Sequence, residues 1–178
     1  CRASNLPTVW TNVLAAVVLS GALGTPGSIG ATVAAAAALS LIYLGGMALN
    51  DVLDAEEDRT KRPGRPIPSG RVPGTWGLTF AIIGSLASLG VAFAISLPAA
   101  LATFIGLVLA WAYSAPPVRL KQNGWWGNLA VGLCYEGLAW VTGTALVLGG
   151  ALPPAMVLLV ALLYSLGCHG IMTINDYK

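Results

Sequence analysis

The sequence predicts an all-α protein, a polytopic bundle of transmembrane helices. Its mean hydropathy is +0.77 and only 9% of its residues are charged, values far outside the range of a soluble domain. Apolar runs long enough to cross a bilayer recur along the chain. They are rich in Ala, Leu and Gly and show no period-two alternation, so strands are not expected. A lipid bilayer is therefore an expected partner, and nucleic acid is not.

Short stretches rich in Gly, Pro or charged residues divide the apolar sequence. They lie at 24–30, 50–74, 96–98, 114–124 and 149–154. Six candidate spans remain, at about 6–23, 29–50, 76–95, 98–113, 125–148 and 154–176. The fourth of these spans is the shortest. We expect one membrane domain over residues 1–178. Because the chain starts with Cys rather than Met and stops directly after a charged motif, we expect further helices to follow Lys178.

The placement of the charges supports a count of six spans. With six spans, every Lys and Arg falls on the same side of the membrane, and the loops of the opposite side carry no charge. The nine cations are Arg2, Arg59, Lys61, Arg62, Arg65, Arg71, Arg119, Lys121 and Lys178. The positive-inside rule makes their side cytoplasmic, with both chain ends there.

One charged stretch, "NDVLDAEEDRTKRPGRPIPSG" at residues 50–70, holds five of the seven acidic residues of the chain. If the second span continues as a helix, Asp51, Asp54 and Asp58 lie on one face, and Asn50 is one turn before Asp54. These three aspartates are called the aspartate ladder below. Unpaired carboxylates in such a column repel each other, and divalent cations relieve that repulsion. Oxygen ligands of this kind favour Mg²⁺, which substrate phosphates commonly help to coordinate.

Arginines follow the carboxylates within the same stretch. Arg62, Arg65 and Arg71 stand among proline and glycine residues that stiffen a loop. Because the guanidinium fork binds phosphate oxygens in pairs, the combination predicts a site for a diphosphate and its metal. The alternative is an ordinary acidic helix end followed by a positive-inside loop.

A second cationic segment, "YSAPPVRLKQNGWWGN", joins spans four and five on the same predicted side. Arg119 and Lys121 are placed to reach a diphosphate held by Asp51 and Asp54. The alternative reading makes them membrane anchors, with Trp125 and Trp126 as aromatic residues of the interface.

Two ionisable residues lie inside predicted spans. Glu136 is the only acidic residue well within one, and His169 stands two helical turns before Asp176 on the same face. Such residues usually face the bundle interior and have a role. A hydrogen-bonded structural role is the alternative for each. A membrane transporter with a Glu136–His169 proton relay is the competing function of another class.

The stretch from Asn50 to Asp58, followed by "RPGRPIPSGR", resembles the first aspartate-rich motif of the UbiA-type intramembrane prenyltransferases. That family carries a second such motif at the end of its sixth helix, where Asn175 and Asp176 stand here. The resemblance covers the whole chain and implies a truncated nine-helix domain. "GWWGN", "GLCYEGLAW" and "HGIMTINDYK" resemble the bacteriochlorophyll and chlorophyll synthases, which esterify chlorophyllide. "NDVLDAEEDR" departs from the aromatic-rich form of that branch, which leaves the acceptor open.

The resemblance implies a Mg²⁺-dependent enzyme of the cytoplasmic membrane face that moves a prenyl group from an allylic prenyl diphosphate to a lipophilic acceptor. The acceptor is a tetrapyrrole or a cyclic or aromatic compound, with a quinone precursor as the alternative. The implied catalytic residues are Asp51, Asp54, Asp58, Arg65, Arg119 and Lys121. The implied substrate-binding residues are Asn50, Arg62, Tyr113, Tyr135, Glu136, Trp140, His169 and Asn175. The implied metal ligands are Asp51, Asp54, Asp58 and Asp176.

Overall fold

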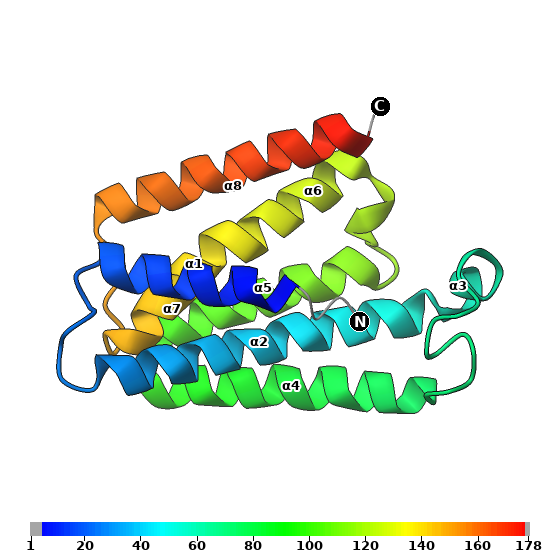
Figure 1. The fold of residues 1–178 in the computed structure, drawn as a ribbon, viewed down its shortest axis with the longest axis horizontal. Coiled ribbons are helices and arrows are strands. Elements are labelled where there is room, and N and C mark those ends of the chain that lie inside the picture. Colours follow the sequence, from blue (N-terminus) through cyan, green and yellow to red (C-terminus); the bar gives the residue numbers. More distant parts are fainter. Residues whose placement is uncertain (1–4, 177–178) are drawn as a thin grey trace.

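Long helices lying side by side form nearly the whole molecule (Figure 1). The computed structural model describes residues 5–176, except for the side chains of Tyr135, Glu136 and Asp176. Within that range there is no strand. The helices are α1 (Leu6–Leu19), α2 (Ser28–Leu53), α3 (Ala55–Lys61), α4 (Gly74–Ile95), α5 (Leu97–Ser114), α6 (Gly124–Gly132), α7 (Ala139–Val147) and α8 (Ala155–Asp176). A 3-10 turn, η2 (Leu120–Gln122), precedes α6, and a π-helical segment, η3 (Leu133–Leu138), joins α6 to α7.

Local signals account for several helix ends. Gly27 adopts φ +79° before the first residue of α2, a conformation that glycine takes without strain. The Ser96 hydroxyl accepts a hydrogen bond from the Ala99 N–H at 3.3 Å and caps α5. The Asn123 side chain accepts one from the Trp126 N–H at 3.1 Å and caps α6. The predicted interruptions at 24–30, 96–98 and 114–124 thus contain real helix boundaries.

The all-α fold is confirmed. The predicted count of six spans is confirmed only roughly. Among residues 5–176, four helices are long and apolar enough to cross a membrane, namely α2, α4, α5 and α8. The first run forms only the 14-residue α1, because the chain turns at Gly21 and Gly24, which have φ values of +70° and +101°. The fifth run forms α6, η3 and α7 in succession, where the π-helical segment divides the regular helix.

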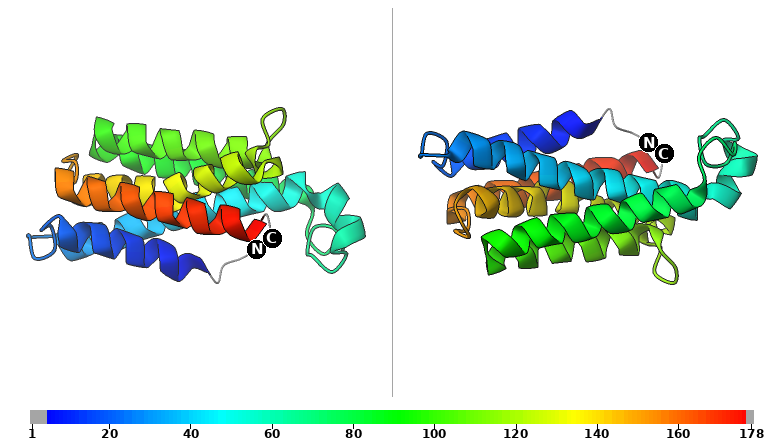
Figure 2. Two further views of the ribbon diagram at one scale, coloured as in Figure 1. Left: turned by 90° about the horizontal axis from the view of Figure 1, so that it is seen from above. Right: turned by 90° about the horizontal axis from the view of Figure 1, so that it is seen from below.

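The loops gather at two ends of the bundle. Figure 2 shows α3, the 115–123 connection, the start of α1 and the end of α8 at one end. The turns between α1 and α2 and between α7 and α8 lie at the other end. The cation-bearing loops therefore share one end, called the charged end below, as the predicted topology requires.

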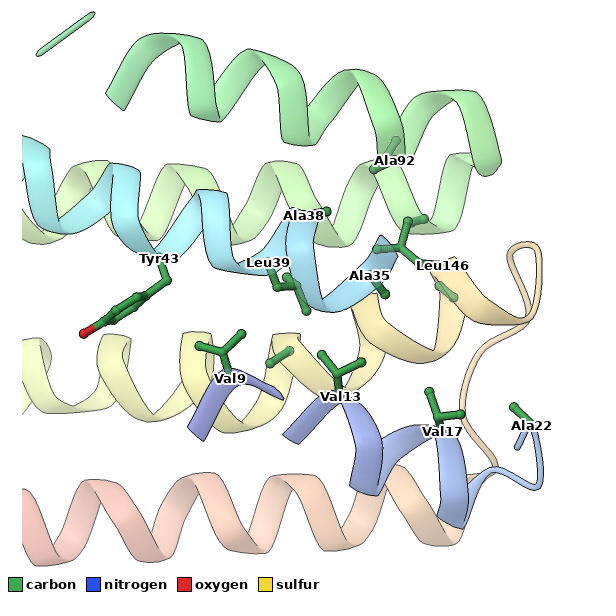
Figure 3. Packing of buried hydrophobic residues seen from close by; sticks show 14 residues of the cluster. Val9, Val13, Val17, Ala22, Ala35, Ala38, Leu39, Tyr43, Ala92 and Leu146 are labelled. Carbon is green, nitrogen blue, oxygen red and sulfur yellow. The ribbon is translucent and has the colours of Figure 1, made fainter. Parts of the chain in front are cut away.

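The core depends on small residues that let the helices approach closely. Val13 of α1 and Leu146 of α7 belong to a buried cluster together with Ala35 and Leu39 of α2 (Figure 3). A Cβ placed on Gly132 of α6 would lie 2.7 Å from the Ser165 carbonyl oxygen of α8. Such contacts are typical of helix packing in membranes, where close van der Waals contact holds helices together.

The orientation in the membrane is testable by cysteine labelling. With the native cysteines replaced by Ala, single cysteines placed at 59–71 or 119–121 should react with an impermeant thiol reagent only from the cytoplasmic side. Cysteines placed at 24–30 or 149–154 should react only from the outside, because the uncharged loops lie at the opposite end of the bundle. Reaction of the 59–71 loop from the outside would overturn this orientation.

Candidate active site at the charged end

The helix that carries the aspartate ladder changes direction at Asp54. α2 ends at Leu53, Asp54 has φ −93° and ψ 0°, and the short α3 begins at Ala55. A regular helix through Asp58, the condition for the predicted one-face arrangement, is therefore not present. The backbone still runs on, since the Asp54 N–H donates to the Asn50 carbonyl at 3.0 Å. The ladder is nevertheless divided between cations, because Asp51 and Asp58 face Arg65 whereas Asp54 faces Arg119 and Lys121.

The outer two aspartates of the ladder share one arginine. Arg65 Nη1 lies 2.5 Å from Asp58 Oδ2 and 3.3 Å from Asp51 Oδ1. Both aspartates are buried, at 9% exposure for Asp51 and 5% for Asp58. A buried carboxylate is costly without a cationic or hydrogen-bonding partner. The guanidinium of Arg65, from the loop at residues 62–73 that is called the proline-rich loop below, therefore compensates both charges.

The middle aspartate of the ladder pairs with the other loop. Asp54 Oδ1 lies 2.5 Å from Lys121 Nζ and 3.0 Å from Arg119 Nη2. Arg119 adopts φ 38° and ψ 57°, a left-handed conformation that is uncommon for a residue other than glycine. Its Nε is buried and has no hydrogen-bond partner among the residues that the structure describes. The segment between α5 and α6 thus brings two cations to Asp54, and their contact with a diphosphate stays a prediction.

Asn50 connects three elements at this point. Its Oδ1 accepts a hydrogen bond from Lys121 Nζ at 2.8 Å and one from the Ser114 hydroxyl at 3.0 Å. Ser114 is the last residue of α5 and is 1% exposed. We did not predict this serine as a site residue. Its signal in the sequence, a single Ser before Pro116 and Pro117, is too common to identify it.

The remaining charges of the stretch turn to solvent. On α3, Glu56 pairs with Arg59, and Lys61 Nζ lies 2.6 Å from Glu57 Oε1. The hydrogen bond from Lys61 lowers the pKa of Glu57 below its usual value. Each of these two glutamates forms an ion pair with a cation of its own helix. They lie outside the aspartate ladder, in agreement with the sequence.

The other two arginines of the proline-rich loop differ in their contacts. Arg71 Nη2 donates to the Gly64 carbonyl at 2.5 Å and Nε donates to Ser69 Oγ at 3.1 Å, so it holds the loop in shape. Arg62 is exposed, directly after α3. A phosphate-binding role for Arg62 stays a prediction.

The residues predicted from the later spans have different surroundings. Trp140 is buried against Ala16, Val157 and Ala161, and its Nε1 has no hydrogen-bond partner within the described part of the chain. Tyr113 is half-buried on α5, and Asn175 is exposed at the end of α8. The side chains of Tyr135, Glu136 and Asp176 lie outside the described residues, so their predicted roles remain predictions.

His169 lies in the contact between α6 and α8. It is 6% exposed, and its ring meets that of Trp125 edge-on, with ring centroids 4.7 Å apart. Its Nδ1 lies 3.4 Å from the Thr173 hydroxyl, while its Nε2 has no partner among the described residues. No hydrogen bond that we describe joins it to the ladder.

The oxygen atoms of the ladder match the chemistry of a divalent cation. Among the described side chains, no three His, Cys, Asp or Glu residues form a ready metal cluster. Instead, two oxygens meet at each of two cationic nitrogens. Asp51 and Asp58 meet at Arg65 Nη1, and Asn50 and Asp54 meet at Lys121 Nζ. One or two carboxylates, completed by waters and substrate phosphates, are what Mg²⁺ usually takes from a protein, so the residues fit.

An apolar cavity of about 290 Å³ adjoins this site. It lies between α2, the proline-rich loop and α4, and Asp51, Ile67, Trp76 and Phe80 are among the residues that line it. Asp51 thus stands where the charged end meets an apolar surface of α2 and α4.

The fold and the site together define an integral membrane protein with an acidic and cationic cluster at one end of a helix bundle. Residues 7–178 match the model of the UbiA prenyltransferase family, and the chain belongs to that family. The family resemblance of the sequence is thereby confirmed.

Relatives of known function agree with the branch that the sequence indicated. The chain is 52% identical to the bacteriochlorophyll synthase 33 kDa chain of Rhodobacter capsulatus over 133 residues, covering 74% of this chain and 44% of the relative. It is 42% identical to the bacteriochlorophyll synthase 34 kDa chain of Chloroflexus aurantiacus over 166 residues, covering 90% and 51%. It is 40% identical to the chloroplastic chlorophyll synthase of Arabidopsis thaliana over 137 residues, covering 73% and 35%. The chain spans about half the length of the curated relatives it matches, or less.

Solved structures agree with the fold. One, from a study of digeranylgeranylglyceryl phosphate synthase in membranes, has a TM-score of 0.76 at 19% identity over 97% of this chain and 57% of its own. A UbiA homologue from Archaeoglobus fulgidus has a TM-score of 0.58 at 21% identity over 89% and 56%. At these identities the likeness concerns the fold alone.

Proposed function

We propose that this protein is a Mg²⁺-dependent prenyltransferase whose charged end, on the cytoplasmic side, binds the diphosphate of an allylic prenyl donor. The observation that carries the proposal is the meeting of the aspartate ladder with three cations from two separate loops, namely Arg65, Arg119 and Lys121. Carboxylates suit a metal ion, and guanidinium and ammonium groups suit phosphate oxygens. A diphosphate chelated by metal requires both.

UbiA prenyltransferases generally use a divalent metal ion. In this chain the three aspartates of the ladder would hold it, with Asp176 as a further ligand. When bound, Mg²⁺ neutralises charge on the diphosphate and makes it a better leaving group. We infer that Arg65, which compensates Asp51 and Asp58, turns to the phosphate oxygens once metal and donor are present, while Lys121 stays on Asn50 and Asp54 and binds the phosphate oxygens with its remaining N–H.

The cations have a defined task in the reaction. Cleavage of the bond between the prenyl carbon and the diphosphate oxygen concentrates negative charge on the leaving diphosphate. Donors held in place beforehand stabilise such charge with little reorganisation. Arg119 suits this task because its Nε–H is buried with no partner among the described residues, and Lys121 has a third N–H beyond the two that serve Asn50 and Asp54.

The prenyl cation left behind must meet the acceptor before it meets water. The apolar helix surfaces and the cavity beside Asp51 provide water-poor surroundings for the prenyl chain. We propose a tetrapyrrole carboxylate as the acceptor, as in the esterification of chlorophyllide or bacteriochlorophyllide. The similarity to three synthases of this branch supports that choice. An aromatic quinone precursor is the alternative.

The test is an assay of the full-length protein in membranes with radiolabelled geranylgeranyl diphosphate. We expect label to move into pigment ester with chlorophyllide or bacteriochlorophyllide, to stop with EDTA and to resume with Mg²⁺. Parallel reactions with aromatic acids and quinone precursors test the alternative acceptor. Label in none of these products would overturn the proposed function.

A further inference from the structure

Ser114 stands behind the charged residues of the site rather than among them. It ends α5, is 1% exposed and donates its hydroxyl hydrogen to Asn50 Oδ1 at 3.0 Å. Asn50 lies 64 residues earlier, on α2. A buried hydroxyl is costly unless it is hydrogen-bonded, and an apolar residue of similar size would avoid that cost. A serine at this position is therefore best explained by the hydrogen bond that its hydroxyl donates to Asn50 Oδ1.

The direction of the Asn50 amide follows from its partners. The Lys121 ammonium is only a donor, so the amide oxygen, not the amide NH₂, must face it. The same oxygen accepts from Ser114, which then acts as a donor too. The oxygen is thus held from two sides, once by the end of α5 and once by the lysine.

The position of the Lys121 ammonium depends on two oxygens. Nζ lies 2.8 Å from Asn50 Oδ1 and 2.5 Å from Asp54 Oδ1. A lysine side chain has a large rotamer entropy, so an ammonium held by two fixed acceptors is better prepared to bind a phosphate than a free one. If the hydrogen bond from Ser114 is removed, Asn50 Oδ1 is no longer fixed in position as an acceptor for Lys121.

We propose that Ser114 is a positioning residue of the diphosphate site, which acts through the Asn50 amide to hold Lys121 in place for the ligand. This inference rests on the proposed function, because it takes the diphosphate as the ligand of Lys121. Ser114 itself need not touch the substrate. Replacing Ser114 should change the affinity for the ligand more than the stability of the fold, because Asn50 Oδ1 keeps Lys121 as a partner when the serine is removed.

The experiment measures binding of inorganic pyrophosphate, in the presence of Mg²⁺, to the purified full-length protein by calorimetry. Ser114→Ala should weaken binding about three- to tenfold, the range of one neutral hydrogen bond. Ser88→Ala is the matched control. Ser88 is also 1% exposed, but it donates to the carbonyls of Gly84 and Ala38 within the contact of α4 and α2. It should change binding less than twofold.

A double-mutant cycle separates positioning from a general packing effect. In a Lys121→Met background, Ser114→Ala should change pyrophosphate binding less than twofold, because the group that it positions is gone. Equal effects of Ser114→Ala and Ser88→Ala, or an undiminished effect of Ser114→Ala in the Lys121→Met background, would overturn the inference and leave the proposed function intact. Absence of Mg²⁺-pyrophosphate binding by the unmodified protein would count against the proposed function itself.

Discussion

Asp54→Asn in the full-length protein should lower the rate of prenyl transfer by about two to three orders of magnitude. The substitution keeps size and hydrogen-bonding capacity but removes one negative charge. That charge now faces Arg119 at 3.0 Å and Lys121 at 2.5 Å, and we propose that it holds Mg²⁺ against the diphosphate. The loss should be largest in the transition state, where the charge on the leaving group peaks. Added Mg²⁺ should restore only little of the rate.

Glu57→Gln makes the same change of charge three residues along the chain and is the matched control. Glu57 is exposed and pairs with Lys61 on α3, away from the ladder. Its substitution should change the rate of prenyl transfer less than twofold, since exposed ion pairs of this kind contribute little. Equal and mild effects of the two substitutions would show that residues 50–70 are an ordinary charged loop.

Local features of the sequence predicted much of the fold. Helix boundaries depend on neighbouring residues, such as Gly27 before α2 or Asn123 before α6. Long hydrophobic runs predict the segments that lie in lipid. The gathering of charged loops at one end followed from counting spans. The short α1 was not predicted, because Ala22 and Leu23 continue the apolar run although Gly21 turns the backbone.

Features of the site that depend on distant partners were harder to predict. Spacing alone places Asp51, Asp54 and Asp58 on one face of a continuous helix and predicts them as a group. Their division between Arg65 on one side and Lys121 on the other arises from two loops separated by a helix hairpin. Periodicity within one helix contains no information about such contacts.

Arg65→Ala should destabilise the full-length protein by about 3–5 kcal/mol, the usual cost of removing one partner from a buried ion pair. Arg65 Nη1 is the cationic atom that Asp58 Oδ2 contacts at 2.5 Å, and the Asp58 side chain is only 7% exposed. The loss should appear as a lower midpoint of thermal unfolding in detergent without divalent cations. Arg59→Ala, which removes the exposed partner of Glu56, should shift the midpoint little.

Mg²⁺ should restore the stability of Arg65→Ala more than it stabilises the unmodified protein. Two carboxylates, Asp51 and Asp58, meet where Arg65 Nη1 now lies, and a cation that binds only the folded state raises its stability by mass action. In the unmodified protein the ion must first displace the guanidinium, so its gain is smaller. The variant should therefore show the steeper rise of the unfolding midpoint with Mg²⁺ concentration. Parallel curves for both proteins would mean that these two carboxylates do not form a cation site.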